Sequence, residues 1–428
     1  MFNISASDSV FDSLRMSPTF VDLYVDSDVQ AERWRKLIAL FHKNFGDALW
    51  PSFFSSPGRT ELCGNHTDHN QGVVLAAAVH LDSIAVASPT DKKRITVFAE
   101  QYDGPFIVDL NELLPEAGEF GTTTALIRGV ASRLCELGYR VGGFNAYITS
   151  DVLIGSGLSS SASIEVLIGT IFNAFYNDSK IALQTIAMIG QHAENVFFGK
   201  PCGLMDQIAC TFGGVVKVDF HDPEKPDITR VSSDLGEKDY SLLVVNTGGS
   251  HADLTDDYAA IPREMKAVAS AFGRNSAREL TFFEDVISNI NRLRVEVGDR
   301  AILRVIHFLN ENERVAEQVA ALEKDDFAEF LRLVNESGDS STRWLQNCFS
   351  PQSVREQSIM LALALTESFL KQTGGGASRV HGGGFAGTIQ VWMPTGKISR
   401  YEDLMNGVFG DGAVVRLRIR QMPALQIG

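Results

Sequence analysis

The first half of the chain alternates between strand-like and helix-like patterns of hydrophobic and polar positions. Branched and small apolar residues run through 73–87, hydrophobic and polar residues alternate over 94–100, and 142–152 again has a strand-like composition. Residues 124–137 form an amphipathic helical pattern. A second helical pattern follows Asp178 and Ser179, which we expect to cap it, with apolar residues at Ala182, Ile186, Ile189, Ala193 and Phe197. The half is predicted to be mixed α and β.

The second half has fewer strand patterns and longer helical ones. Residues 240–248 predict a buried strand, long helical patterns run from about 263 to 372, and 388–392 and 413–418 predict closing strands. Between the halves, the strand pattern FGGVVKVDF leads into the polar, proline-containing turn HDPEKPD, which is typical of a domain boundary. We expect a first domain at residues 1–215, a second at 216–428, and a cleft between them.

Composition narrows the class of protein. The 428 residues are 44% hydrophobic and 21% charged, which favours a globular protein over disordered and membrane classes. The net charge of −15, without a local Lys/Arg cluster, argues against nucleic acid as a partner. The N-terminal residues lack the pattern of a signal peptide, and the five cysteines are scattered, as is typical of reduced thiols. We therefore expect a cytoplasmic protein that binds small molecules and has no membrane partner, as a monomer or weak dimer.

The stretch GRTELCGNHTDHNQG (58–72) is dense in polar side chains and has two interpretations. His66 and His69 are three residues apart with Asp68 between them, a spacing that sometimes holds zinc. A zinc site needs further ligands, however, and no complementary His/Cys pair with ligand spacing is found elsewhere in the sequence. The stretch is therefore predicted to bind a polar ligand.

The stretch VLIGSGLSSSASIEVLIG (152–169) is rich in Gly and Ser but has apolar flanks, so it is not a flexible linker. A strand, a glycine turn and a helix start predict an anion site that suits phosphate. The loop lacks the lysine of a Walker loop, and Ser160 replaces the third glycine of GxGxxG. Such a site requires another positive charge, normally Mg²⁺. Glu194 is a candidate ligand, although spacing alone favours a solvated carboxylate there.

A third stretch, TGGGASRVHGGGFAG (373–387), follows a long helical pattern and leads into a strand. Its glycines could form a loop over phosphates or a tight helix–strand connection. The stretch PCGLMDQ (201–207) contains Asp206, which by itself is an ordinary carboxylate at a helix start.

Together these stretches resemble the GHMP kinase superfamily, and the first resembles the galactokinase family in particular. The galactokinase pattern GRxNLIGEHTDYNxG stands here as GRTELCGNHTDHNQG, PxGxGLSSSAS as LIGSGLSSSAS, GxGFGG as GGGFAG, and PCGxMDQ as PCGLMDQ. The resemblance runs from about Pro57 to the C-terminus. It implies a two-domain α+β GHMP kinase-like fold, mixed sheets with helices, and transfer of a phosphoryl group from Mg·ATP to the C1 hydroxyl of a galactose-like sugar.

The resemblance also implies roles for individual residues. Asp206 would be the general base, and Arg59 would keep it ionised and stabilise charge on the transferred group. The implied sugar-binding residues are Asn65, His66, Asp68, Gly203 and Tyr258. The implied ATP-binding residues are Gly155, Ser156, Gly157, Leu158, Ser159, Ser160 and Ser161. The implied Mg²⁺ ligands are Ser161 and Glu194.

The first motif departs from the pattern at Asn65, where the family has Glu, and at His69, where it has Tyr. The family's Glu contacts the sugar near its C6 hydroxyl. A neutral amide there would either still bind galactose or admit a sugar modified at C6, such as galacturonate. Two rival functions are a non-catalytic sugar and ATP sensor, and a zinc hydrolase that uses the HTDH cluster.

Overall fold

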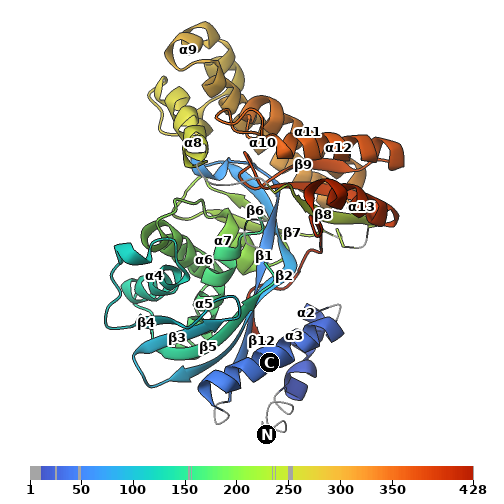
Figure 1. Cartoon of the computed structure of the whole chain (residues 1–428). Helices are drawn as coiled ribbons and strands as arrows, with labels where there is room; N and C mark the ends of the chain where they lie inside the picture. Colours follow the sequence, from blue (N-terminus) through green and yellow to red (C-terminus); the bar gives the residue numbers. More distant parts are fainter. Residues whose placement is uncertain are drawn as a thin grey trace.

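The computed structural model describes residues 11–24, 27–46, 50–152, 155, 157–233, 235–236, 238–248 and 254–427. Two β-sheets, each covered by helices, form a lower and an upper half (Figure 1); the first is mixed, with β3 and β5 parallel, and the second is antiparallel throughout. The first sheet comprises β1 (Ser52–Cys63), β2 (Val73–Thr90), β3 (Arg94–Ala99), β4 (Phe106–Asp109), β5 (Gly143–Ser150), β6 (Val215–Asp219), β7 (Asp227–Val231) and β12 (Leu425–Ile427). The second comprises β8 (Tyr240–Asn246), β9 (Ala377–His381), β10 (Thr388–Pro394) and β11 (Val414–Leu417). The predicted fold class is confirmed.

The first sheet buries both faces. Neighbouring residues of β2 point to opposite sides, so that Ala85 packs against one layer of helices and Val86 against the other. One layer contains α4 (Thr123–Glu136), α5 (Ser160–Tyr176), α6 (Leu183–His192), η3 (Ala193–Phe198) and α7 (Met205–Phe212). The opposite layer contains α2 (Pro18–Leu23) and α3 (Ser27–Phe45). Burial on both sides explains the nearly continuous apolar run of β2.

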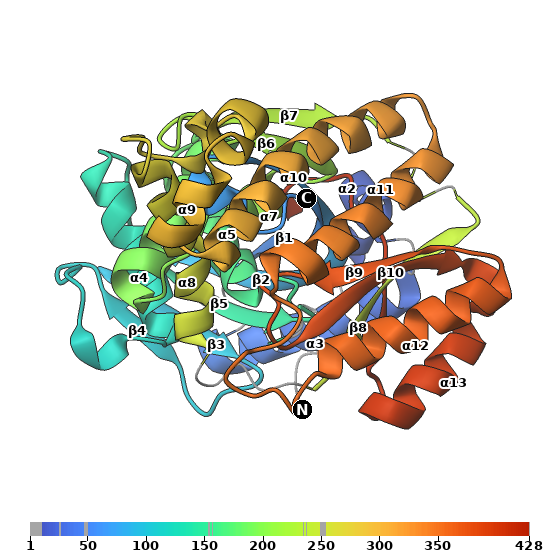
Figure 2. The same cartoon turned by 90° about the horizontal axis from the view of Figure 1, so that it is seen from above.

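The second sheet is covered in the same way. Leu242 and Val244 of β8 pack with α10 (Asp299–Glu323) and α11 (Phe327–Ser340), whereas Leu243 and Val245 pack with α12 (Ser358–Thr373) and α13 (Ile398–Phe409). Figure 2 shows these two helix pairs on opposite sides of the sheet. The remaining helical segments of this half are α8 (Thr255–Ser270), η4 (Ala277–Glu279), η5 (Phe282–Ile287), α9 (Ile290–Glu296), η6 (Ser341–Leu345) and η7 (Thr395–Lys397).

The long strand β2 joins the halves. Its C-terminal part pairs with β5, while Leu75 and Val79 in its N-terminal part share a core with α10 of the upper half. β1 pairs with β2 in antiparallel orientation, and the connection between them is the polar first motif, with the short η1 (Asp68–Asn70) inside it. The hairpin therefore delivers that motif to the junction of the two halves.

Most elements expected from the patterns are present, but the expected cap at Asp178 and Ser179 is wrong. Both residues have positive φ, at 52° and 56°, and lie in a turn, while α6 begins after Ala182 without a side-chain cap. The predicted helix is present, but the Asp-Ser pair belongs to the turn before it. In the described ranges, no helix has the length and apolar character needed to cross a lipid bilayer.

The domain division at residues 215 and 216 stays a prediction. The strands β6 and β7 pair with the first sheet, and β12 returns to it from the end of the chain. Division by sheet membership would place the boundary after Val231 and would assign β12 to the first domain.

Candidate active site

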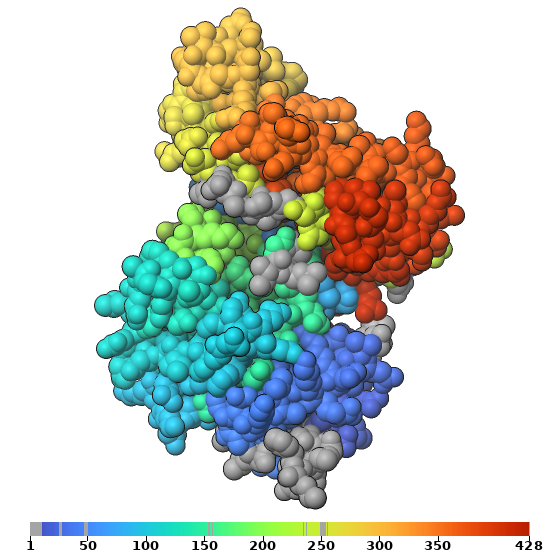
Figure 3. Space-filling model, in the orientation of Figure 1, coloured from blue at the N-terminus to red at the C-terminus, as the bar shows by residue number. Residues whose placement is uncertain are grey.

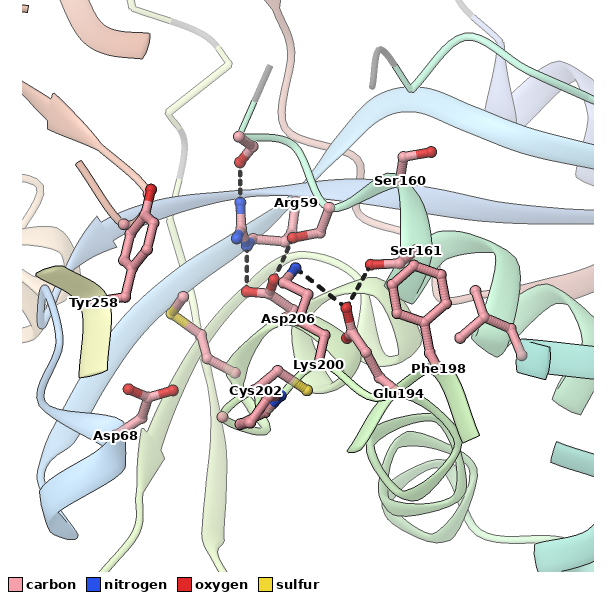
Figure 4. Close-up of a pocket in the computed structure, with 18 of the residues that line it drawn as sticks. Arg59, Asp68, Ser160, Ser161, Glu194, Phe198, Lys200, Cys202, Asp206 and Tyr258 are labelled. Carbon is pink, nitrogen blue, oxygen red and sulfur yellow. Dashed lines mark hydrogen bonds and ion pairs between the residues drawn. The ribbon is translucent and has the colours of Figure 1, made fainter. Parts of the chain in front are cut away.

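A cavity of about 1570 Å³ lies between the two halves. The first half contributes Arg59, Ser161 and Asp206 to its wall, and the second contributes Tyr258 and Gly383. Figure 3 shows the surface narrowing between the halves, and Figure 4 shows Arg59, Ser161, Asp206 and Tyr258 around the cavity. Residues of all three motifs and of the PCGLMDQ stretch thus meet in one cavity.

Arg59 on β1 and Asp206 in the first turn of α7 form an ion pair at the centre of this cavity (Figure 4). Arg59 Nε lies 2.7 Å from Asp206 Oδ1, and its guanidinium also donates to the carbonyl of Gly157. Ser159 Oγ donates to the other carboxylate oxygen. Burial raises the pKa of Asp206, but the charge of Arg59 and these hydrogen bonds outweigh it and lower the pKa below its ordinary value. The carboxylate is ionised at neutral pH and can accept a proton.

The Gly/Ser loop leads into α5, as the pattern predicts. Gly155 and Gly157 have φ of 77° and 69°, a left-handed backbone that favours glycine. At Gly157 an added Cβ would also lie 2.9 Å from the side chain of His381. Leu158 is fully buried and does not line the cavity, and its carbonyl accepts a hydrogen bond from Arg59 N at 3.0 Å, so the implied contact of Leu158 with ATP gains no support. Ser156 lies outside the described residues.

Ser160 and Ser161 begin α5, where the first N–H groups have no partner within the helix. Ser161 Oγ donates to Glu194 Oε1 at 3.0 Å. Gln207 Nε2 lies 3.0 Å from both Glu194 Oε2 and Glu165 Oε2 and joins the two carboxyl groups. Glu194 is therefore buried and held in place, and it is not the solvated helix carboxylate that spacing alone favoured.

Three residues around this site, Glu165, Gln207 and Lys200, were not predicted from the sequence. Burial raises the pKa of Glu165 well above its ordinary value, and the nearby Glu194 raises it further. A charged residue in the apolar run IEVLIG was the available signal for Glu165. Lys200 Nζ lies 3.3 Å from Glu194 Oε1. Burial lowers the pKa of Lys200, but the carboxylates of Glu194 and Asp206 outweigh it, so the net direction is upward.

At the other end of the cavity, Asp68 lies against Gly203. A Cβ added to Gly203 would be 1.7 Å from Asp68 Oδ2, so a side chain there would displace the carboxylate. The side chain of Asp68 is 11% exposed, and His69 N donates to its Oδ1 at 2.9 Å. The glycine thus provides the space in which this carboxylate reaches the cavity.

His66 and Tyr258 form the neighbouring wall. Their rings stack with centroids 6.4 Å apart. His66 Nε2 donates to Gly383 O at 2.8 Å, and Tyr258 Oη donates to Gly384 O at 2.9 Å, so both side chains are tied to the third motif. Burial lowers the pKa of His66 to about 4, which keeps the imidazole neutral near pH 7.

Asn65 is hydrogen bonded to protein groups through both amide atoms. Its Nδ2 donates to Glu61 Oε1 at 3.0 Å and to Gly382 O at 2.7 Å, and its Oδ1 accepts from Asn347 Nδ2 at 2.7 Å. Glu61 is itself paired with Arg379 at 2.5 Å, and Arg379 is fully buried. Only 1% of Asn65 is exposed, so direct contact with a ligand would have to replace one of these bonds.

The described residues contain no group of three or more His, Cys, Asp or Glu side chains suited to a metal ion. The zinc interpretation of the HTDH cluster therefore gains no support. Magnesium has different requirements, because it takes one or two carboxylates and fills the remaining positions with water and phosphate oxygens. The hard oxygen donors of Ser161 and Glu194 fit that chemistry.

Comparison with known proteins agrees with the geometry. Residues 39–89 match the galactokinase galactose-binding signature, and residues 125–214 match the N-terminal domain of GHMP kinases. The chain is 31% identical to galactokinase of Actinobacillus pleuropneumoniae over 359 residues, which cover 84% of this chain and 89% of the relative. It is 30% identical to galactokinase of Glaesserella parasuis over 366 residues, covering 85% and 91%. The chain belongs to the galactokinase family.

Solved structures show the same fold. Lactococcus lactis galactokinase, complexed with galactose, superposes with a TM-score of 0.74 at 23% identity and covers 91% of this chain and 97% of its own. A mevalonate kinase structure superposes with a TM-score of 0.60 at 16% identity, covering 86% of this chain and 99% of its own. The galactokinase family match spans both halves of the chain, so both belong to one GHMP kinase fold.

The departure of this chain from the galactokinase pattern at Asn65 is accompanied by a second departure at Glu61. The pattern GRxNLIGEHTD has Asn and Glu four residues apart, whereas this chain has Glu61 and Asn65 at the same positions. The two side chains have exchanged places and are hydrogen bonded to each other. The paired exchange at positions 61 and 65 was the sequence signal that could have revealed the contact between Glu61 and Asn65.

Proposed function

We propose that this galactokinase family member transfers the γ-phosphoryl group of ATP to the anomeric C1 hydroxyl of galactose. The observation that supports this most is the ionised Asp206, paired with Arg59, in the same cavity as the Ser161–Glu194 pair. The cavity extends on one side to Asp68 and on the other to the Gly/Ser loop, which provides space for a sugar and a nucleotide.

Each residue then has a definite part in the reaction. Asp206 accepts the proton of the attacking hydroxyl, and Arg59 keeps the carboxylate ionised and balances negative charge that develops on the phosphoryl group. Asp68 and His66 hydrogen bond the sugar hydroxyls, and the backbone of the Gly/Ser loop binds phosphate. Ser161 and Glu194 would hold a magnesium ion, which would supply positive charge to the phosphate oxygens. Positioning and charge stabilisation suffice, and no covalent enzyme intermediate is needed.

For the sugar, we propose galactose. The hypothesis of a substrate modified at C6 was motivated by Asn65 and by the neighbouring His69. His69 lines the cavity, but the amide of Asn65 is hydrogen bonded to Glu61, Gly382 and Asn347 and does not face the sugar freely. We therefore propose that Asn65 positions the first motif against the third. No observation favours the sensor, because a sensor requires no paired base such as Asp206.

The test is ADP release from Mg·ATP over a panel of sugars that includes galactose and galacturonate. Asp206→Asn should lower kcat by about 10²–10⁴-fold while sugar binding is retained. Asp403→Asn, on an exposed position of α13, is the matched control and should behave as wild type. Turnover of galacturonate alone would refute galactose as substrate, and binding without turnover of any sugar would favour the sensor.

The remaining expectations stay proposals. A cytoplasmic location, a monomer or weak dimer, and the absence of a membrane partner remain expectations, and the net charge of −15 argues against nucleic acid as a partner. Sedimentation of the purified protein would establish the oligomeric state.

A further inference from the structure

Lys200 is a cavity residue to which neither the motifs nor the family pattern assign a role. It lies two residues after η3 and follows Gly199, whose φ is 82°; its backbone N–H donates to Glu194 O at 3.1 Å. This turn brings its side chain back over Glu194. Figure 4 shows the Lys200 amino group between the carboxylates of Asp206 and Glu194.

The two cations in this part of the cavity are bound very differently. The guanidinium of Arg59 is committed to Asp206 and Gly157 and is buried. Within the part of the chain that the structure describes, Lys200 Nζ makes one hydrogen bond, to Glu194 Oε1 at 3.3 Å, and its side chain is 64% exposed. Charge-assisted N–H···O bonds are usually about 2.7–2.9 Å long, so this contact is a loose one. A lysine ammonium has three donors, which leaves capacity for a ligand in the cavity.

The site also requires positive charge near the phosphate groups, which Lys200 can supply. Glu194 and Asp206 place two carboxyl groups on the wall of the cavity where a triphosphate would bind. The Gly/Ser loop lacks the lysine of a Walker loop, so its backbone supplies partial charges only. The ammonium group of Lys200 is exposed and only loosely bound, and it lies between Asp206, the proposed base, and Glu194, the proposed Mg²⁺ ligand. The phosphoryl group would pass through this position during its transfer.

We propose that Lys200 is a further catalytic residue, whose ammonium group binds the phosphoryl group during its transfer. The proposal rests on the kinase function proposed above. The bond from the γ-phosphorus to the ADP oxygen breaks, the bond to the sugar hydroxyl oxygen forms, and the hydroxyl proton goes to Asp206. Lys200 stays protonated throughout and only stabilises charge on the phosphoryl oxygens.

The alternative is that Lys200 serves only as a counter-ion for Glu194. The two roles differ in what they do to nucleotide binding, because only a phosphoryl contact distinguishes a triphosphate from a diphosphate. The measurement is calorimetric titration of Lys200→Met with AMP-PNP, a non-hydrolysable ATP analogue, and with ADP, each in the presence of Mg²⁺. Lys43→Met, on an exposed position of α3 outside the cavity, is the matched control.

We expect Lys200→Met to weaken AMP-PNP binding about tenfold with unchanged ADP affinity, and to lower kcat about 10²–10³-fold with an unchanged sugar KM. Lys200→Arg, which keeps the charge, should recover most of the AMP-PNP affinity, and equal urea midpoints would show that both variants are folded. Equal losses for the two nucleotides, or no loss for either, would overturn the proposal. If wild type phosphorylates no sugar, the proposed function fails, but the comparison of AMP-PNP with ADP still decides the role of Lys200.

Discussion

The exchanged pair at positions 61 and 65 makes a quantitative prediction. In the structure Glu61 is 3% exposed, accepts a hydrogen bond from Asn65 and forms an ion pair with the fully buried Arg379. Arg379 also donates to the carbonyl of Leu62 at 2.7 Å, so the pair anchors the strand that leads into the sugar motif. Glu61→Gln retains a carbonyl oxygen that can accept from Asn65 and removes the charge, which isolates the ion pair.

The expected loss follows from the geometry. With charge centres roughly 4 Å apart and an effective dielectric constant of about 20, the attraction is about 4 kcal/mol. Breaking a buried pair from one side typically costs about 3–5 kcal/mol, because the remaining charge is left without its partner. We therefore expect Glu61→Gln to lower the free energy of unfolding by about 3–5 kcal/mol. Adding Arg379→Gln should cost less than the sum of the single changes, with a coupling of at least about 2 kcal/mol.

The assay is urea unfolding of wild type, both single variants and the double variant, followed by tryptophan fluorescence and far-UV circular dichroism. Coincident transitions by the two probes would license the comparison of free energies. Additive losses, within about 0.5 kcal/mol, would refute the argument, because independent sites show no coupling. As a functional readout, Glu61→Gln should raise the sugar KM more than it changes ADP affinity.

Three further predictions follow from individual contacts. Gly203→Ala would place a Cβ 1.7 Å from Asp68 Oδ2, so the sugar KM should rise at least about tenfold with AMP-PNP affinity unchanged; an unchanged KM would mean that Asp68 does not bind the sugar. Glu194→Gln removes the only carboxylate of the proposed Mg²⁺ pair, so the Mg²⁺ concentration for half-maximal activity and for AMP-PNP binding should rise more than about tenfold; equal values in both proteins would count against this ligand. Because burial lowers the pKa of His66 from 6.5 to about 4, the unfolded chain takes up a proton over this range that the folded chain does not. Stability is therefore lost as pH falls through that window, by up to about 3 kcal/mol, and His66→Asn should remove this part of the dependence in urea titrations at pH 7 and 4.5. An unchanged pH slope would contradict it.

The sequence by itself determined the local features of the protein. Side-chain alternation and helical spacing are properties of short segments, so they predicted strands such as β2 and helices such as α4 near their observed bounds. The glycine turn before α5 was predicted for the same reason, since left-handed backbone at Gly155 and Gly157 favours glycine wherever it occurs. The three motifs and the PCGLMDQ stretch indicated the family, because their resemblance depends on residue order alone.

Local signals failed where neighbours in space set the outcome. Asp178 and Ser179 looked like a cap, but the turn that holds them has a left-handed backbone. Glu194 looked solvated, yet the packing of α5, η3 and α7 buries it beside Glu165. The free energy of a charged side chain depends on every group around it, and the sequence does not state which groups those are.

Only the tertiary structure decided how the site is assembled. Arg59 and Asp206 are 147 residues apart in the chain and 2.7 Å apart in space. Glu61 and Arg379 are separated by 318 residues, and their pairing shows why Asn65 is occupied by the protein itself. Such contacts arise when two sheets and their helices pack around the β1–β2 hairpin. Burial periodicity can be read from a single segment, but the partner of a buried charge is set by the arrangement of the whole chain.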